Sequence, residues 1–494
     1  MQYSAAFTSR KQNKLSPGPP ILTIPTIPIV TDTPTSTASA SGNTPANNLS
    51  LRIRVGWGLG TLAMSLMFQS TSLLVLKYLV DYVGIAAGLA GLLIGAAKAY
   101  DAVTDPLMGT ISDRTKTRWG RRRPYLLLGA AVSAASFMLL FHLGTFTGLT
   151  GQMLVFVVAL ALLLNATGYT IFNVPYLAMP AEMTSNYHER TKLISFRAGA
   201  VSVGGVLATA VGPFIITSFG NGVPGHAAMS YVLGLTILAA GLACLWMTRD
   251  APTVTHTPPQ TASFRQQFRT ALENRPFVLL LGVKITHLIG LATYLSSMPF
   301  FFSVILGVSM SWMGLYFLVQ SSFILISQFG WVGFTRRFGK NRAYYLAAFF
   351  YVAALASWLF AAEGEPLALI LLRAVFTGLG AGGVLLIGQS LLPDTMQYDY
   401  QRTGIRREGV FAGVYTTAEK LSFALGPALM GILLGAAGYV GGADALAEQT
   451  RESRWVIYAG VSVLPALGIA SAALIMTRFR LGEAELSGER KPAA

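Results

Sequence analysis

Charged residues are scarce in this sequence. Asp, Glu, Lys and Arg account for 12% of its 494 residues, whereas 53% of the residues are hydrophobic. Soluble domains carry about 25% charged residues, and so few charges cannot cover the surface of a soluble protein of this length. Lipid is therefore the expected solvent for much of the surface.

Cysteine is almost absent as well. The one cysteine, Cys244, lies in an apolar run, which excludes an internal disulfide and any metal site built from several cysteines. The sequence also lacks a Gly-x-x-x-x-Gly-Lys-Ser/Thr loop, the phosphate-binding element of many ATP-driven proteins. An ATP-driven pump is therefore not expected. The protein is not expected to be an enzyme or to bind a cofactor.

Residues 1–50 differ in composition from the rest of the chain. They are rich in Thr, Ser, Pro, Ala and Asn, and such a segment cannot build a packed core. The apolar stretch 21–30 is interrupted by Pro25 and Pro28, so it does not read as a secretory signal. We predict a disordered cytoplasmic tail, with an organelle transit peptide as the alternative because no acid precedes Asp32.

Long apolar segments follow this tail, each long enough for the roughly 20 residues that a spanning helix needs. They predict an all-α polytopic membrane protein with twelve transmembrane helices. The predicted spans are residues 54–79, 85–110, 125–145, 152–182, 196–220, 227–248, 276–304, 309–334, 343–362, 366–392, 408–437 and 454–478.

A Pro-containing linker, residues 249–275, divides these spans six and six. The predicted domains are thus a six-helix bundle over 51–248, a second over 276–478, and a cytoplasmic tail over 479–494. The loops rich in Lys and Arg alternate with loops that have almost none, apart from Arg451. Because positive residues stay in the cytoplasm, both termini are expected on the cytoplasmic side of an inner membrane.

The same distribution explains the net charge of +15. The basic residues lie in short loops between apolar segments and form no single face, so they do not indicate a nucleic-acid partner. The expected partners are the lipid bilayer and a small-molecule substrate, and the expected oligomeric state is a monomer.

The loop between the second and third spans carries the most specific motif, Gly-x-x-x-Asp-Arg-x-x-x-Arg-x-Gly-Arg-Arg. It matches the signature of the major facilitator superfamily, and residues 333–342 repeat it in degraded form in the corresponding loop of the second half. We predict a cytoplasmic gate in which an Asp at a helix end pairs with arginines; the alternative is that the arginines only set topology. The motif comprises Gly109, Asp113, Arg114, Arg118, Gly120, Arg121 and Arg122.

Ionisable residues inside a span are costly and commonly functional. In the second span, Asp101 and Asp105 are four residues apart and share a helical face, and Lys98 is placed to neutralise Asp101. Two carboxylates on one face can bind a small cation or hold one proton between them; a structural salt bridge is the alternative. Lys420 lies deep in the eleventh span, where it should face a central cavity and be paired.

Several polar and aromatic residues are candidates for substrate binding. The fourth span offers three of them around the helix break at Pro175, the fifth span begins with an arginine, and the eighth span contributes an indole. These candidates are Tyr169, Asn173, Tyr176, Arg197 and Trp312. Among the other ionisable residues inside spans, Lys284, which could snorkel toward the cytoplasm, and His287 are weaker candidates for a functional role. Glu419 lies next to Lys420, and His287 and Glu419 are the next candidates for coupling if the carboxylates of the second span are structural. Arg373 is expected to serve packing or a hinge.

Five segments together resemble the glycoside–pentoside–hexuronide:cation symporters. They are residues 98–109 and 118–125 around the second span, 169–176 in the fourth, 195–197 in the fifth and 403–409 before the eleventh. The likeness extends over about residues 54–478. It implies the major facilitator fold.

The resemblance also implies roles for single residues. Asp101 and Asp105 fall on the aspartates that coordinate the coupling cation, Arg197 on an arginine near the sugar, and Lys420 on a lysine that pairs with the cation-site carboxylates. The sequence departs from the family at two places. Asn173 replaces an aspartate that binds sugar hydroxyls, and residues 56–71 contain no acid where the family has one. The expected coupling ion is H⁺ or Na⁺, with no other metal; because sodium would have fewer charged ligands here than in the family, a proton is at least as strong a candidate.

These patterns predict a secondary active transporter that moves a sugar or glycoside with a cation by alternating access. One alternative is a facilitator or symporter of a non-sugar solute such as a lipid or amphiphile. A second alternative is a non-transporting membrane sensor or assembly factor, against which the retained Asp101, Asp105 and Lys420 argue.

Overall fold

The computed structural model describes residues 49–479 and 481, except residues 185, 253–268, 270, 405–407 and 443–448. The predicted tail over 1–50 lies almost wholly outside the described residues. So do most of the predicted linker and most of the predicted C-terminal tail.

The described residues form long helices and no strand. The first half of the chain contains α1 (Leu51–Lys77) continued by η1 (Tyr78–Tyr82), α2 (Ala87–Arg114), α3 (Arg123–His142) with η2 (Leu143–Thr145), α4 (Gly151–Met183), α5 (Tyr187–Val206) continued by η3 (Leu207–Val211) and α6 (Gly212–Ser218), and α7 (Gly222–Met247). The second half contains α9 (Arg275–Phe300) with η4 (Phe301–Ile305), α10 (Met310–Phe338), α11 (Lys340–Ser357) with η5 (Trp358–Phe360), α12 (Leu367–Thr403), α13 (Glu408–Ala436), and α14 (Arg451–Tyr458) continued by η7 (Ala459–Val463) and α15 (Leu464–Met476).

Twelve membrane-spanning helices are confirmed within the described part of the chain. Eleven are long and apolar enough to cross a bilayer. The twelfth, α2, has 28 residues, but Lys98, Asp101 and Asp105 lower its apolarity. The predicted boundaries differ most where polar residues extend a helix beyond the lipid: α12 continues to Thr403, although its predicted span ends at residue 392.

Helix ends follow local sequence signals. Ser50 caps α1 by accepting a hydrogen bond from the backbone N–H of Ile53, and Asn274 caps α9 by accepting one from the N–H of Phe277. The helix α12 ends at Gly404, whose φ of 68° is left-handed and suits glycine. These caps fix where the chain leaves a helix and enters a loop.

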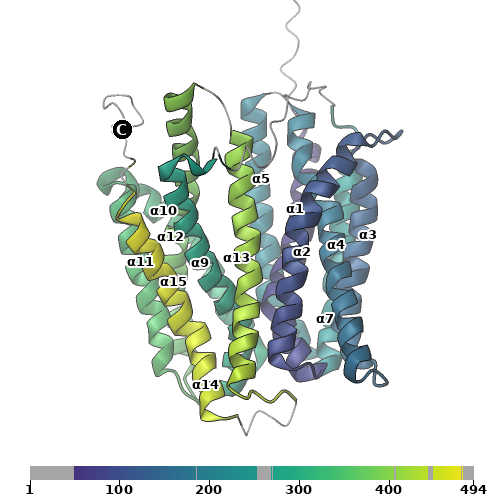
Figure 1. Ribbon diagram of the computed structural model, residues 1–494, viewed down its shortest axis with the longest axis vertical. Coiled ribbons are helices and arrows are strands. Elements are labelled where there is room, and N and C mark those ends of the chain that lie inside the picture. Colours follow the sequence, from purple (N-terminus) through teal and green to yellow (C-terminus); the bar gives the residue numbers. More distant parts are fainter. Residues whose placement is uncertain are drawn as a thin grey trace, which may run out of the picture. The chain divides into compact units, whose positions relative to one another are not determined.

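The helices of each half pack mainly against one another. In the first half α3 contacts α4 and α7, and α1 contacts α5 and α7; in the second half α12 contacts α10 and α11, and α9 contacts α13 and α15. Figure 1 shows α1–α7 on one side and α9–α15 on the other. We call the end of the bundle that carries the loop between α2 and α3 the basic end, and the end that carries η1 the opposite end.

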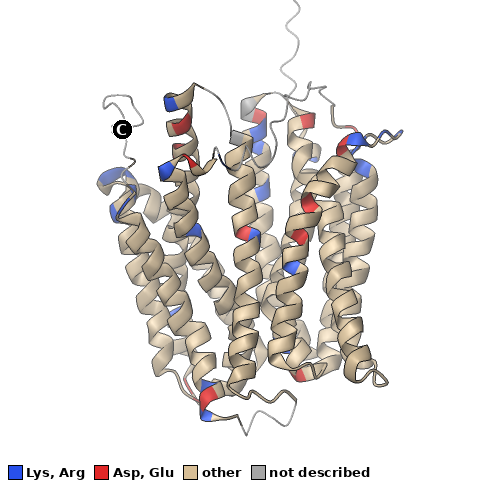
Figure 2. Cartoon of the chain, in the orientation of Figure 1, with Lys and Arg blue, Asp and Glu red and all other residues tan. Residues whose placement is uncertain are grey.

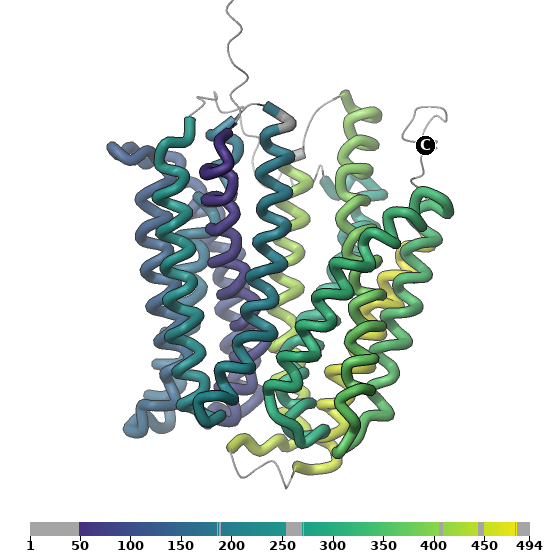
Figure 3. The backbone as a smooth tube through the Cα atoms, turned by 180° about the vertical axis from the view of Figure 1, so that it is seen from behind, coloured from purple at the N-terminus to yellow at the C-terminus, as the bar shows by residue number. Residues whose placement is uncertain are grey.

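Contacts between the halves are formed by α2 with α13, α1 with α9, and α10 with α6. Figure 3 shows α10 and α6 meeting near the opposite end. Toward that end α2 and α13 approach through glycines: a Cβ on Gly91 would lie 2.9 Å from the Cα of Gly431. Toward the basic end, a Cβ on Gly409 or Gly413 of α13 would meet nothing within 4 Å. The two halves are therefore packed tightly at the opposite end and separate toward the basic end.

A buried polar group strengthens the contact at the opposite end. Lys77 and Asp81 of the first half form an ion pair, and the Lys77 side chain is 2% exposed. From the second half, the Tyr439 hydroxyl donates to both Asp81 oxygens at 3.1 and 3.4 Å. The Lys77 ammonium also lies 4.9 Å from the ring centroid of Phe300. We call these four residues the opposite-end lock.

Exchanging Gly431 for alanine should lower the apparent melting temperature of the purified protein. The new Cβ would lie 2.5 Å from the carbonyl oxygen of Ala87, and overpacking of this kind costs about 1–3 kcal/mol. The control is Gly413→Ala, which meets no atom and gains helix propensity. Equal melting temperatures of the two variants in a thermal denaturation series would contradict the tight contact.

Candidate functional site

Charged residues on α2 and α13 lie midway along the bundle (Figure 2). On α2, Asp101 and Asp105 share the face that turns toward α4. There Thr170 donates a hydrogen bond to Asp105 Oδ1 at 2.9 Å, and its hydroxyl lies 3.3 Å from Asp101 Oδ1. One hydroxyl thus holds both carboxylates in one place. Sequence reasoning missed Thr170, because a lone Thr inside a span carries no pattern.

The second half supplies the counter-charge. Lys420 of α13 forms an ion pair with Asp105 Oδ2, with both side chains about one fifth exposed. Among the described residues, this salt bridge joins the two halves midway along the bundle. The structure thus brings together Asp101, Asp105 and Lys420, and we call these three residues with Thr170 the coupling cluster.

Lys98 lies near Asp101 and also over an aromatic ring. Its ammonium is 4.3 Å from the ring centroid of Phe68 on α1, and no ion pair with Asp101 is formed among the described residues. Lys98 and Asp101 instead line a small cavity of about 20 Å³, together with Asn165 and Tyr169. Such a volume holds about one water molecule. The space beside Asp101 is therefore large enough for a small ion or a water molecule and too small for a sugar.

Tyr169, one of the predicted substrate residues, lies beside this cluster. The Tyr169 ring centroid lies 5.7 Å from the Lys420 ammonium, and Tyr169 lines the same small cavity as Asp101. Asn173 is half-buried one helical turn after Thr170. Tyr169, Asn173 and Arg197 remain our proposed contacts to a solute.

The other two predicted substrate residues lie elsewhere. Tyr176 is 1% exposed. Its hydroxyl donates to the carbonyl oxygen of Trp57 at 2.6 Å and lies 2.5 Å from the Thr61 hydroxyl. We therefore correct its role to packing within the first half. Trp312 lies in the first turn of α10 at the opposite end, where it is half-buried and packs against the hydrophobic core, so its predicted substrate role is corrected to packing at that end.

The weaker candidates are all engaged within the second half. Lys284 does not snorkel: its ammonium binds Glu419 Oε2 at 2.7 Å. The His287 ring lies 6.3 Å from the ring of Tyr351.

Arg373 has the packing environment that its sequence position predicts. It pairs with Glu365 at 2.5 Å, donates to the Ser357 hydroxyl at 3.1 Å and lies over the ring of Trp358. The residues of this group come from the end of α11 through the start of α12.

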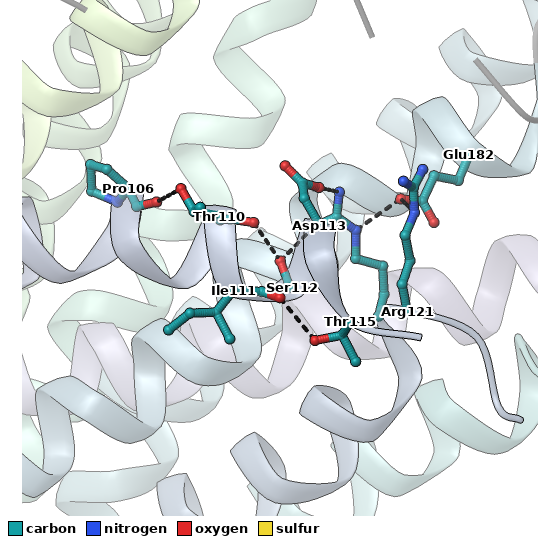
Figure 4. A network of polar contacts seen from close by, with 10 residues as sticks. Pro106, Thr110, Ile111, Ser112, Asp113, Thr115, Arg121 and Glu182 are labelled. Carbon is teal, nitrogen blue, oxygen red and sulfur yellow. Dashed lines mark hydrogen bonds and ion pairs between the residues drawn. The ribbon is translucent and has the colours of Figure 1, made fainter. Parts of the chain in front are cut away.

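A second polar network lies at the basic end (Figure 4). Arg122, whose side chain is 10% exposed, pairs with Asp113 and donates to Glu182 Oε1 at 2.8 Å and to Ser112 Oγ at 2.5 Å. Arg121 pairs with the same Glu182 oxygen at 2.9 Å. Glu182 was not predicted, because an acid after Pro180 at the end of α4 belongs to no recognisable motif. We call this group the Arg122 network.

The remaining motif residues have other surroundings. Arg114 and Arg118 are exposed and have no ion-pair partner among the described residues. Gly120 has a φ of 91°, a left-handed conformation that requires glycine. The space near Gly109 is open enough for a side chain, since a Cβ there would lie 3.8 Å from the nearest atom of Val174. All described partners in the Arg122 network belong to the first half.

The fold and these two polar groups define a class of protein. Twelve spanning helices in two halves, with a charged pair between the halves midway along the bundle, are the architecture of a secondary transporter of the major facilitator type. Within the described residues no group of three or more His, Cys, Asp and Glu side chains could hold a metal ion.

Comparison with known proteins identifies the family. Residues 56–483 match the model of the MFS/sugar transport protein family, and the chain belongs to this family. Its relatives place it among the glycoside–pentoside–hexuronide:cation symporters.

Two curated relatives and one solved structure illustrate the similarity. The chain is 25% identical to a putative glycoside/cation symporter of Escherichia coli, over 89% of this chain and 94% of that protein. It is 28% identical to a glucuronide carrier protein homolog of Escherichia coli, over 84% of this chain and 90% of the relative. The crystal structure of a D-xylose-proton symporter matches with a TM-score of 0.58 at 15% identity, over 87% of this chain and 97% of that one, which concerns the fold alone.

Proposed function

We propose that this protein transports a sugar or glycoside together with a cation, H⁺ or Na⁺, by alternating access. The observation that carries the proposal is the ion pair between Asp105 and Lys420, which joins the halves beside a second carboxylate and a small cavity. The name of the putative glycoside/cation symporter among the relatives supports it.

The coupling cluster suggests how ion binding and movement of the halves are linked. A cation that binds Asp101 and Asp105 competes with the Lys420 ammonium for the same carboxylate oxygens. Its arrival weakens the contact between α2 and α13, and its departure restores that contact. Ion occupancy thereby changes the free energy of separating the halves, which is the requirement for coupling.

The orientation is part of the same proposal. The basic end faces the cytoplasm of the inner membrane, because Lys and Arg concentrate there, and both termini are cytoplasmic. The halves are packed at the opposite end, so this conformation opens toward the cytoplasm. The protein acts as a monomer.

An anionic sugar is a second candidate substrate. Arg197 is exposed and has no acidic partner among the described residues. By contrast, Lys98 lies over the ring of Phe68 and Lys284 pairs with Glu419. An arginine without a partner favours a solute that brings a carboxylate or sulfonate. The relative named as a glucuronide carrier protein homolog supports this candidate.

A binding and uptake experiment tests the proposal. Purified protein is heated with D-xylose, melibiose, methyl β-D-glucoside and methyl β-D-glucuronide, with and without Na⁺ and at two pH values. A binder stabilises the folded state by mass action, so at least one sugar should raise the melting temperature and accumulate in vesicles under an ion gradient. If only lipids or amphiphiles stabilise the protein, the sugar proposal is wrong.

The Arg122 network is proposed as the cytoplasmic gate, and its two acids should differ in effect. Asp113→Asn should slow transport while leaving solute affinity unchanged, because Asp113 lies far from the coupling cluster. Glu182→Gln should slow transport more, since Glu182 is 17% exposed and holds two arginines, whereas Asp113 is 58% exposed and holds one. Equal loss of binding and transport in correctly inserted variants would indicate a folding role instead.

A further inference from the structure

Two consecutive residues of α13 serve different halves of the protein. Successive residues of a helix point about 100° apart. Lys420 reaches across to Asp105 on α2, while Glu419 turns toward α9 of its own half, where Lys284 binds its Oε2 at 2.7 Å. Glu419 therefore lies beside the coupling cluster without belonging to it.

The Lys284 ammonium is held on two sides. Its distance to the ring centroid of Tyr415 is 3.2 Å, and Tyr415 precedes Glu419 by one helical turn. The ammonium is thus enclosed between an aromatic face and a carboxylate, and the Lys284 side chain is only 10% exposed. This arrangement fixes Glu419 Oε2 in position. Glu419 Oε1 has no hydrogen-bond partner among the described residues.

The Glu419 side chain is 46% exposed although it lies about midway along a spanning helix. A carboxylate that faced hydrocarbon there would be costly, so such groups face the bundle interior or a water-filled cavity. The Glu419 side chain therefore faces the water-filled space between the halves.

This geometry distinguishes three roles. If the ion pair between Lys284 and Glu419 served only to hold α9 against α13, it would contribute little to stability, because one of its partners is half exposed. In the coupling cluster two carboxylates share the Lys420 ammonium, which leaves a negative charge for an ion, whereas Lys284 and Glu419 form a one-to-one pair with no second carboxylate bonded to it among the described residues. A carboxylate with one oxygen anchored and one free is instead an oriented acceptor for hydroxyl groups, and hydrogen bonds to a charged acceptor are the strong ones.

We propose that Glu419 is a specificity-determining residue whose carboxylate accepts hydrogen bonds from hydroxyls of a polyhydroxylated solute, with Lys284 as its positioning residue. This inference rests on the proposed function. It assigns hydroxyl recognition to the second half of the protein, whereas Asp101 and Asp105 of the first half handle the ion. A solute that contacts Glu419 and Tyr169 together would bridge the two halves.

Equilibrium binding of methyl β-D-glucoside and methyl β-D-glucuronide to the full-length protein in nanodiscs tests the inference. The Glu419→Gln variant should bind both probes about 10- to 100-fold more weakly, because a hydrogen bond to a charged group is replaced by a neutral one. For the monodeoxy analogue that lacks the contacted hydroxyl, wild type and variant should bind alike. Glu363→Gln, which alters an exposed acid in the loop before α12, should not change affinity.

Two further measurements keep the result interpretable. Lys284→Met combined with Glu419→Gln removes the pair without leaving an unpaired ammonium, and it should show the same loss of affinity if Glu419 is the acceptor. The dependence of uptake on pH and Na⁺ should be unchanged in Glu419→Gln. Loss of that dependence with unchanged affinity would make Glu419 a coupling residue and overturn the inference.

The failure of the inference differs from the failure of the proposed function. If wild type binds either probe and Glu419→Gln binds it equally well, only the inference is wrong. If wild type binds neither probe nor any sugar of the melting-temperature screen, the proposed function and the inference are both wrong.

Discussion

Replacing Lys420 with alanine should abolish accumulation of solute against its gradient. The substitution removes the charge that pairs with Asp105, and an unpaired charge of this kind costs about 3–5 kcal/mol when it is buried and less when it is partly exposed. Asp105→Asn should have the same effect, because the cation then loses its ligand and Lys420 loses its partner. Asp101→Asn should also stop accumulation, since Asp105 would then be the one carboxylate of the cluster for both Lys420 and the coupling cation.

The double variant Lys420→Ala with Asp105→Asn separates folding from coupling. No charge is left without a partner, so insertion and expression should return to near the wild-type level. Accumulation should not return, because the carboxylate that would carry the ion is absent, although exchange at equal concentrations should persist. The three quantities are measured separately in vesicles, as surface level, equilibrium exchange and uphill uptake.

A matched control is available in the second half. Lys340 and Asp394 form an ion pair at 2.6 Å near the basic end, entirely within that half. Lys340→Ala should therefore leave accumulation almost intact. If Asp101→Asn and Asp105→Asn still concentrate solute under an imposed ion gradient, the carboxylates of α2 are structural and coupling lies elsewhere.

Replacing Asp81 with asparagine should open the opposite end of the bundle. The substitution leaves the Lys77 ammonium without a counter-charge in a position that is 2% exposed. Removing one partner of such a pair costs about 3–5 kcal/mol, and the cost is relieved when the halves separate there and water reaches Lys77. The population should therefore shift from the conformation seen here to one that opens at the opposite end.

Thiol accessibility measures this shift. In a background where Cys244 is replaced by serine, a cysteine placed at Val80 lies in the closed contact, because Val80 is 2% exposed. A membrane-impermeant maleimide added from outside should label it several-fold faster in Asp81→Asn than in the parent. The control Glu452→Gln, at an exposed acid of α14, should not change the rate. Unchanged labelling in Asp81→Asn would show that the opposite-end lock does not hold the halves together.

The sequence best predicted the features that depend on residues close together in the chain. Long apolar runs predict spans because a helix must satisfy its own backbone in lipid, and a spacing of four places Asp101 and Asp105 on one face. Lys420 was expected to be paired because of its depth in a span. Its placement against Asp105 came from the family resemblance and could not follow from spacing.

The features that the sequence did not predict depend on which helices pack against one another. Thr170 and Glu182 lie on α4, and their neighbours in the sequence do not mark them. Thr170 matters because α4 packs against α2, and Glu182 matters because α4 packs against α3. Tyr176 lies next to the helix break at Pro175, which made it a candidate for substrate binding, but the packing of α4 against α1 buries it. Lys284 had the length to snorkel, and the approach of α9 to α13 gave it Glu419 instead.

The central claim is that the cluster of Asp101, Asp105 and Lys420 couples ion movement to solute movement. Solute-driven ion flux in proteoliposomes tests it most directly, with internal pH and ²²Na⁺ uptake recorded after addition of a sugar that stabilises the wild-type protein. Wild type should carry H⁺ or Na⁺ inward with the sugar, and Asp105→Asn should exchange the sugar without moving either ion. Sugar-driven ion flux that persists in Asp105→Asn would contradict the account.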